Sequence, residues 1–403
     1  FLILDSRFQE PEAEKLTLTG SLRLEFFARE SSIEELRARA SGLPPPRGDD
    51  TFLPADVRIR LDARAADLRF SADLAVLPYD DGSNQGLGDG GRVLLKQLFA
   101  DLEISDLTFR AGAFEYAWRI RPHGEPFLLD LGRSESFFSG AGDRDVEQAA
   151  GALVKWRAGD FVEVEALWMT ALEAGPASRD ETPAALLVNF PLSERSAVFL
   201  GALHVAGGGS ERVTTWGGGT DWYFGDDREL ELFGEAWIQS GRIASGVSRR
   251  AWAAHAGARA VTGPWRAELS ASRRSGDDDP ADGRDRTFQS YEGQERLRIV
   301  ESAEFGLDWD VNVSSIRFSL VRRLGESAEA RIDAARFRLA ESMPGLDRDL
   351  GIEVDATVSH EISKATTAWI AVAALFGSDT LESATIDRES DTFLAAVGLK
   401  TVW

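Results

Sequence analysis

Cysteine is absent from the 403 residues, so the chain has no disulfide, no thiolate metal site and no cysteine nucleophile. No run of about eighteen apolar residues is present either, which excludes a transmembrane helix. The first residues, Phe-Leu-Ile-Leu-Asp, lack a basic region followed by an apolar core, so we expect any export signal to have been removed already. The sequence has 67 acidic residues and 45 lysines and arginines. The resulting formal charge of −22 argues against nucleic-acid binding.

Motifs for catalysis or metal binding are also scarce. The four histidines, at positions 123, 204, 255 and 360, show no metal-ligand spacing. No G-x-S-x-G turn and no Ser/His/acid set appears. Residues 86–91 fit G-x-G-x-x-G, but a dinucleotide site needs a helix after this motif, and residues 93–104 alternate like a strand. We therefore predict that the protein is not an enzyme and that it uses no cofactor and no metal.

The feature that dominates the sequence is the alternation of apolar and polar residues, which is typical of β-strands with two different faces. It occurs in nineteen segments, residues 16–29, 56–64, 67–77, 93–104, 107–118, 149–157, 161–172, 184–192, 196–206, 213–224, 229–241, 250–261, 265–275, 302–311, 316–324, 328–340, 350–362, 366–376 and 393–403. A bacterial single-chain β-barrel needs an even number of strands. We merge residues 302–324 into one strand with a β-bulge, because the apolar positions shift from odd (Phe305, Leu307, Trp309) to even (Ile316, Phe318, Leu320).

The sequence thus predicts an all-β fold: one transmembrane antiparallel β-barrel of about eighteen strands, formed by residues 1–403, with sixteen and twenty strands left open. Short connections alternate with long ones at residues 30–54, 78–92, 119–148, 173–183 and 276–300. This asymmetry indicates short periplasmic turns and long extracellular loops. The 11 tryptophans and 23 phenylalanines are sufficient for aromatic girdles at both membrane boundaries.

The last predicted strand, residues 393–403, supports this assignment. Phe393, Ala395, Val397, Leu399, Thr401 and Trp403 form one face, and the other face carries Lys400. A terminal strand with an apolar face that ends on an aromatic residue resembles the signal by which the barrel-assembly machinery recognises bacterial outer-membrane barrels. The predicted location is therefore the bacterial outer membrane, with the lipid bilayer as a partner.

Charged residues occupy the inward rows of several predicted strands. Because a charge on the lipid face is costly, we expect these side chains to line the lumen. The basic candidates are Arg58, Arg60, Arg64, Arg69, Arg110, Lys155, Arg157, Arg259 and Arg317, and the acidic candidates are Glu231, Glu235, Glu353 and Asp355. Two interpretations stay open: ion pairs that make the wall rigid, or a field that selects the solute.

Several segments resemble the alginate-export family of outer-membrane porins. They are Ser275-Gly-Asp-Asp-Asp-Pro-Ala-Asp-Gly-Arg-Asp-Arg-Thr-Phe288, Glu235-Ala-Trp-Ile-Gln-Ser-Gly241, Phe337-Arg-Leu-Ala340 and Leu350-Gly-Ile-Glu-Val-Asp355. The resemblance is clearest over residues 229–403. It implies a passive conduit through which an anionic, alginate-like polysaccharide leaves the cell along an arginine-rich constriction.

On this interpretation the arginines contact carboxylates of the polymer, and Glu231, Glu235, Glu353 and Asp355 orient the arginines and limit the strength of binding. Two alternatives stay open, because all three share the same lipid-facing pattern. The barrel is either a diffusion or uptake porin for small solutes, or a scaffold that encloses a periplasmic or lumenal protein partner.

Overall fold

The computed structural model describes residues 15–29, 50–52, 55–77, 92–114, 128, 146–173, 182–193, 195–207, 211–225, 229–279, 281–289, 297–301, 311–342, 348–377 and 391–402. Within these ranges, no helix has the length and the apolar character needed to cross a membrane.

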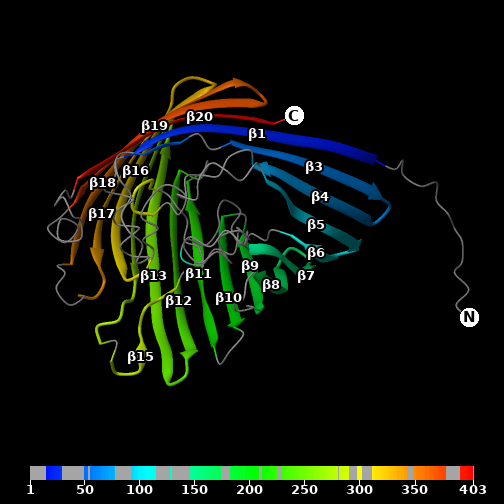
Figure 1. Ribbon diagram of the computed structural model, residues 1–403, viewed down its shortest axis with the longest axis horizontal. Coiled ribbons are helices and arrows are strands. Elements are labelled where there is room, and N and C mark those ends of the chain that lie inside the picture. Colours follow the sequence, from blue (N-terminus) through cyan, green and yellow to red (C-terminus); the bar gives the residue numbers. More distant parts are fainter. Residues whose placement is uncertain are drawn as a thin grey trace, which may run out of the picture.

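Twenty strands make up one sheet in the described residues (Figure 1). Eighteen of them are long: β1 (Lys15–Arg29), β3 (Ala55–Ala65), β4 (Leu68–Leu77), β5 (Arg92–Ile104), β6 (Leu107–Ala113), β7 (Val146–Ala158), β8 (Val162–Glu173), β9 (Thr182–Ser193), β10 (Ser196–Ala206), β11 (Arg212–Phe224), β12 (Leu230–Ala244), β13 (Val247–Thr262), β14 (Trp265–Arg274), β16 (Val313–Arg323), β17 (Ala328–Leu339), β18 (Asp349–Ser363), β19 (Thr366–Gly377) and β20 (Thr392–Val402). Two are short: β2 (Asp50–Phe52), which pairs with β1, and β15 (Arg284–Asp285), which pairs in parallel with β13.

The long strands pair antiparallel with their neighbours in the chain, and β20 pairs with β1. For example, Ser21 lies opposite Val402 and Arg29 lies opposite Leu394. The first and last strands therefore close the ring, and each long strand pairs with a neighbour on both sides over at least part of its described length. The fold is an antiparallel barrel of eighteen long strands, which confirms the predicted fold class and the preferred strand number.

The predicted strand 302–324 differs from the structure. Strand β16 begins at Val313, Val311 and Asn312 form a bend directly before it, and residues 302–310 lie outside the described residues. Leu297–Glu301 form a bend and turn that pack inside the barrel. The bend at Val311 and Asn312 interrupts the predicted strand directly before β16, and the first half of the parity shift that we attributed to a β-bulge lies outside the described residues. Likewise, β6 ends at Ala113, and residues 115–118 of the predicted strand lie outside the described part of the chain.

The glycine-rich motif at residues 86–91 also lies outside the described residues, but the element that follows it is strand β5 and not a helix. This order contradicts a dinucleotide site, because the pyrophosphate of such a cofactor sits at a helix N-terminus.

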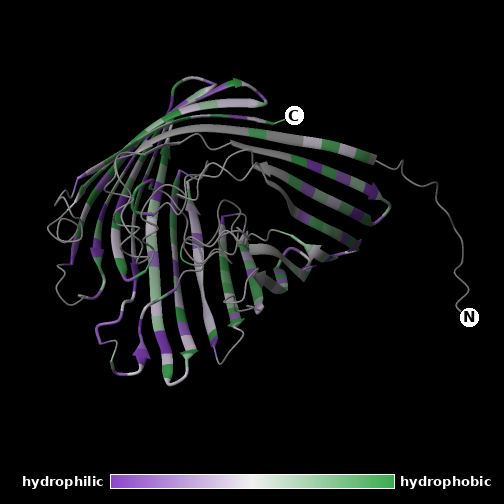
Figure 2. Ribbon diagram, in the orientation of Figure 1, coloured by the Kyte–Doolittle hydropathy of each residue, from purple (hydrophilic) through white to green (hydrophobic). Residues whose placement is uncertain are grey.

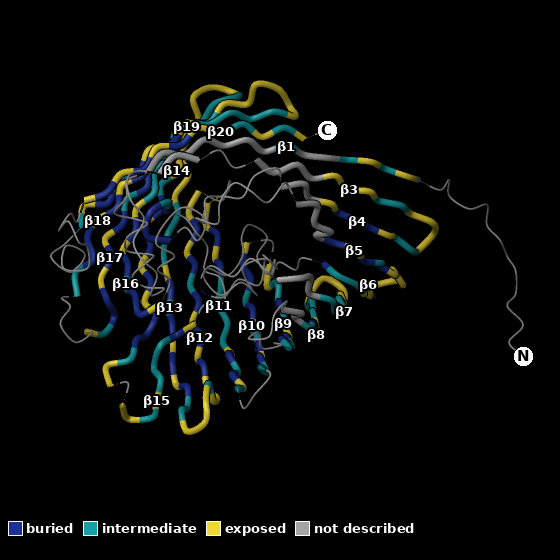
Figure 3. The backbone as a smooth tube through the Cα atoms, in the orientation of Figure 1, coloured by how far each residue is buried: buried dark blue, intermediate teal, exposed yellow. Residues whose placement is uncertain are grey.

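The two faces of each strand differ as the alternation predicts. On β16, Ile316 and Phe318 are 62% and 44% exposed and point outward, whereas Ser315 and Arg317 are buried on the inner face. Figure 2 shows the apolar and polar residues alternating along the strands, and Figure 3 shows buried and exposed positions doing the same. On β20, Phe393 and Val397 are exposed while Leu394 and Ala396 are buried, as predicted for the terminal strand.

Apolar side chains also pack inside the barrel, where they form two clusters. The first joins inward-facing residues of β5 to β13 to Leu128 and Phe288, which belong to connections between strands. The second joins inward-facing residues of β16 to β20 to Leu297, Ile299 and Val300. All five connection residues have at most 2% of their surface exposed. Parts of the chain outside the strands therefore fold into the lumen, and the predicted loop 276–300 is among them.

Candidate functional site

The lumen wall formed by β3 and β4 is built around Asp62. Its carboxylate accepts hydrogen bonds from Arg60 at 3.0 Å and from Arg69 at 2.9 Å, and the hydroxyl of Ser71 donates to it as well. Arg64 lies nearer the short-turn end, where its guanidinium is 3.4 Å from Glu103 on β5. The three described arginines of this predicted group therefore face the lumen, and each is paired with a carboxylate. The side chain of Arg58 lies outside the described residues.

The next strands continue the pattern. Arg110 on β6 forms a bidentate pair with Asp101 on β5, with N–O distances of 2.7 and 2.8 Å, and its guanidinium lies 4.0 Å from the centre of the Phe99 ring. Lys155 pairs with Glu165 at 2.8 Å and Arg157 pairs with Glu163 at 2.7 Å, in both cases between β7 and β8.

On the strands of this wall, the described side chains include as many cations as carboxylates. Its described cations are Arg60, Arg64, Arg69, Arg110, Lys155 and Arg157, and its described carboxylates are Asp62, Asp73, Asp101, Glu103, Glu163 and Glu165. The pairs are not equally covered: the side chain of Arg157 is 68% exposed and that of Arg64 is 60% exposed, against 22% for Arg110. The wall is therefore a ladder of ion pairs in which Arg64 and Arg157, both next to short turns, keep most of their side-chain surface uncovered.

On β11 to β14 a second charged group surrounds Arg259. Its guanidinium donates to Glu231 at 2.7 Å and to Glu268 at 2.8 Å, and the Tyr223 hydroxyl donates to Glu231 at 3.2 Å. In the described residues Glu231 therefore contacts Arg259 and Tyr223.

Glu235 lies four residues beyond Glu231 on β12 and faces the same side of the strand. It contacts no arginine in the described residues. It accepts hydrogen bonds from the backbone N–H of Leu128 at 2.9 Å and from the Trp237 indole at 3.0 Å, and His255 lies 3.8 Å away. Leu128 belongs to the connection between β6 and β7, so Glu235 attaches that connection to the opposite part of the wall. In the described residues the partners of Glu235 thus include a backbone N–H group, an indole and a histidine.

The connection between β14 and β16 is attached in a similar manner. Gln239 exchanges two hydrogen bonds with the backbone of Gln289, at 2.7 and 2.9 Å, and Arg249 pairs with Asp285 at 2.6 Å. At the outer turn of this connection Arg286 donates to Asp277 at 3.1 Å and to Asp282 at 2.6 Å. The hydrogen bond from Arg286 lowers the pKa of Asp282 below its usual 3.8. Within the described residues, no three His, Asp or Glu side chains gather to hold a metal ion.

The strongest set of attachments involves Glu353 and Asp355 on β18. Glu353 accepts hydrogen bonds from the backbone N–H groups of Ile299 at 2.6 Å and Val300 at 2.8 Å, and Asp355 accepts one from Arg298 at 3.0 Å. Glu353 is 0% exposed, because segment 297–301 covers it. These carboxylates hold a segment inside the lumen, which differs from the pore-lining position that we expected.

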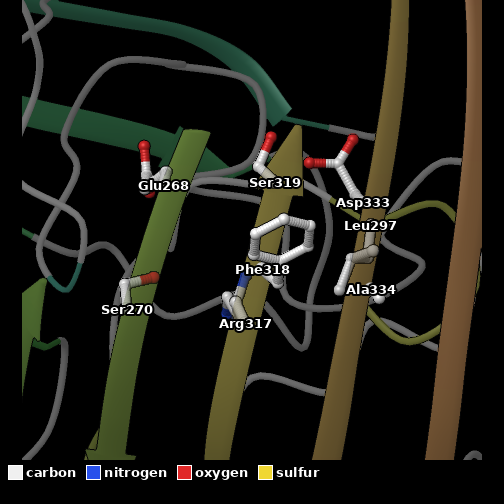
Figure 4. A pocket seen from close by; sticks show the side chains of 8 residues that line it. All are labelled: Glu268, Ser270, Leu297, Arg317, Phe318, Ser319, Asp333 and Ala334. Carbon is white, nitrogen blue, oxygen red and sulfur yellow. The ribbon is translucent and has the colours of Figure 1, made fainter. Parts of the chain in front are cut away.

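Arg317 on β16 holds the same segment from its other side. Its guanidinium forms a bidentate ion pair with Glu301, one of whose bonds is 2.6 Å long, and its Nε donates to Ser315. Both partners are about 7% exposed. Beside them lies a small cavity of about 10 Å³, lined by Glu268, Ser270, Leu297, Arg317, Phe318, Ser319, Asp333 and Ala334 (Figure 4). That volume holds about one water molecule, so the cavity is too small for an organic solute.

The sequence analysis did not single out Glu301, Arg249 or Gln289 for these contacts. Glu301 gives no periodic signal, because it lies in a turn and its partner Arg317 is on another element. A signal did exist for Gln239, Glu353 and Asp355: they belong to the segments that carry the family resemblance. Those segments are where the barrel wall contacts its inward connections.

The ring of strands, the apolar outer face and the charged, partly filled lumen define a transmembrane β-barrel of the bacterial outer-membrane type. Solved structures with this fold confirm the class. The outer-membrane protein OpdK of Pseudomonas aeruginosa, solved with vanillate, has a TM-score of 0.62 at 11% identity, with 96% of this chain and 98% of that chain covered. OccAB1 of Acinetobacter baumannii has a TM-score of 0.63 at 11% identity, with 96% of each chain covered.

OccK3 (OpdO) of P. aeruginosa has a TM-score of 0.61 at 13% identity, with 96% of this chain and 95% of that chain covered. At such identities the similarity establishes the fold. The OpdK structure is that of an outer-membrane protein, which agrees with the predicted location. No protein-family model and no curated protein matches the sequence. The finer resemblance to the alginate-export family has no support from these comparisons.

Proposed function

We propose that the protein is a passive outer-membrane channel for small organic solutes that carry a carboxylate. The observation that carries this proposal is the attachment of the chain's own connections inside the lumen: Glu235 holds Leu128, and Glu353 holds Ile299 and Val300. Connections fixed in the lumen narrow the passage, which favours single small solutes over a polymer chain. They also occupy space that an enclosed protein partner would need, so the scaffold alternative lacks a supporting observation.

The choice of a carboxylate rests on the exposure of the basic groups. Arg64 and Arg157 are paired with Glu103 and Glu163 but keep 60% and 68% of their side-chain surface uncovered. A guanidinium with free N–H groups accepts a second carboxylate from a solute, and a neighbouring glutamate weakens that contact so that the solute leaves again. The vanillate in the OpdK structure, itself a small aromatic carboxylate, agrees with this solute class.

Export of an anionic polysaccharide is the second candidate, because the same exposed arginines would contact uronate groups. The two functions differ in the size of the solute that passes through the barrel. In planar bilayers, the small-solute channel is expected to let vanillate pass down its gradient, measured as a reversal potential, and to respond little to oligo-uronates. Strong, length-dependent block by oligo-uronates together with no vanillate current would contradict our proposal and favour polymer export.

The role of the ladder is tested by charge changes at one of its pairs. Arg157→Gln removes the most exposed of the described cations of this wall, and we expect the reversal potential to shift toward cations. The matched control is the double variant Arg157→Gln with Glu163→Gln, which restores the charge balance and should restore the wild-type reversal potential. Equal reversal potentials in all three proteins would mean that this pair only stabilises the wall.

A further inference from the structure

A cluster of arginines faces outward, toward the membrane, at the long-loop end of β14 to β18. We call the outer arginine cluster the set of Arg273, Arg336, Arg338, Arg348, Glu341 and Asp349. Arg273 on β14 lies opposite Ser314 on β16, and Ser314 lies opposite Arg338 on β17. The neighbouring residues Phe337 and Leu339 are buried against segment 297–300 inside the barrel. Since side chains alternate along a strand, Arg336 and Arg338 point out of the barrel.

The position of the cluster along the barrel follows from the outward residues of β16. Below Ser314 the outer face continues with Ile316, Phe318 and Leu320, and it ends at Arg322, whose guanidinium lies 4.9 Å from the centre of the Trp265 ring. Eight residues of strand span about 26 Å, or about 20 Å of membrane depth at a tilt of about 40°. This length is close to the apolar band of about 25 Å expected for such barrels. The cluster therefore lies at the boundary between hydrocarbon and headgroups on the long-loop side.

Positive charge is in excess there. Among the described side chains, Arg336 pairs with Asp349 at 2.8 Å, and Arg273 and Arg348 share Glu341 at 2.9 and 3.1 Å. Arg338 adds a further exposed cation, so four arginines stand against two carboxylates in a chain whose net charge is −22. Arg273 also lies 5.7 Å from the centre of the outward-facing Trp252 ring, an arrangement suited to a membrane boundary.

We propose that the outer arginine cluster binds the phosphorylated headgroup of a lipid in the leaflet on the long-loop side, which is the outer leaflet for barrels of this type. Guanidinium groups donate paired hydrogen bonds to phosphate oxygens, and excess arginines at a membrane surface attract anionic headgroups. On the neighbouring strands, the exposed Ile316 and Ile352 lie opposite Arg336, below the level of Arg338, and offer an apolar surface to acyl chains. The ligand is therefore amphiphilic, with an anionic head above an apolar tail, and this inference is independent of the solute that the lumen conducts.

The test uses the purified, folded barrel in detergent and measures lipid binding by native mass spectrometry. The probes are lipid A with two phosphates and the same lipid with its phosphates removed. Each arginine at a membrane surface strengthens such binding about five-fold, so Arg338→Gln should weaken binding of the phosphorylated lipid about five-fold and the pair Arg336→Gln with Arg338→Gln about 25-fold. The dephosphorylated lipid should bind all variants equally and weakly.

The matched control is Arg322→Gln, which removes an equally outward arginine beside a tryptophan at the opposite boundary. It should bind phosphorylated lipid A as the wild type does. The proposal is overturned if Arg322→Gln weakens binding as much as Arg338→Gln, if the dephosphorylated lipid binds equally well, or if millimolar inorganic phosphate displaces the lipid. The shift of the gel band on boiling verifies that each variant is folded, and an unchanged conductance in Arg338→Gln separates this site from the lumen.

Discussion

The attachment of segment 297–301 to Glu353 provides a quantitative prediction about the lumen. Glu353→Gln keeps the size of the side chain and one carbonyl oxygen, so it leaves no cavity. It replaces the second acceptor oxygen by an NH₂ group, and the N–H of either Ile299 or Val300 then loses its partner. Leaving a buried backbone donor unsatisfied costs about 1–3 kcal/mol, and the upper part of this range applies because Ile299 and Val300 are almost fully buried. The docked state of the segment should therefore lose about 1.5–3 kcal/mol.

This loss corresponds to roughly a ten- to hundred-fold increase in the population of the undocked segment, because each 1.4 kcal/mol changes an equilibrium about ten-fold. Hydrogen–deuterium exchange measured by mass spectrometry on peptides that contain residues 297–301 reports this opening. We expect exchange of these amides to become faster by that factor in Glu353→Gln, while the amides of β16 and β18 keep their protection. The mean single-channel conductance should rise, since a segment that leaves the wall frees space in the lumen.

Glu165→Gln is the matched control, because Glu165 faces the same lumen and pairs with Lys155 at 2.8 Å but holds no inward connection by a backbone group in the described residues. It should leave the exchange of segment 297–301 unchanged. If exchange in Glu353→Gln stays within two-fold of the wild type, the two backbone hydrogen bonds do not determine how the segment docks, and our account of the narrowed lumen fails.

Three further predictions follow from particular contacts. Gly351→Ala should lower the temperature at which the folded gel band disappears, because φ is +115° there and an added Cβ would lie 2.2 Å from the Phe376 carbonyl oxygen; an unchanged temperature would contradict this. Removing one member of the Arg317–Glu301 pair should cost about 3–5 kcal/mol and removing both should cost less, as a double-mutant cycle in urea would measure; additive losses would argue against a coupled pair. Since the pKa of Asp282 is lowered when folded, its contribution is present above its usual 3.8 and is lost as the pH falls through the lower folded value. Pepsin should therefore cut the 277–286 turn faster at pH 2 than at pH 4, relative to an unfolded peptide of the same sequence.

The β-barrel was predictable because the signal lies in the sequence itself. A residue on a strand faces either lipid or lumen, so rows such as Ile316, Phe318 and Leu320 show the period directly. Turns such as Ser363–Ala365 interrupt the alternation, but they mark nineteen segments, and the prediction of eighteen strands also needed the requirement for an even number. The parity change before Ile316 was harder to interpret. An irregular connection and a β-bulge both shift the period, so the alternation alone does not distinguish them.

The alternation predicts which side chains face the lumen, but it does not predict which groups each of these side chains contacts. Alternation correctly placed Arg157 and Glu353 on the same side of the wall, yet Arg157 is 68% exposed and Glu353 is 0% exposed. The difference arises because some connections fold back over the wall. The sequence at an inward position does not indicate whether water or another segment of the chain will cover the side chain. The segments 235–241, 337–340 and 350–355 support the sequence resemblance and also contain the residues that hold or pack against these connections. Within such a barrel, specific motifs therefore indicate where the lumen is filled, whereas the solute depends on the charged groups that remain uncovered, such as Arg64 and Arg157.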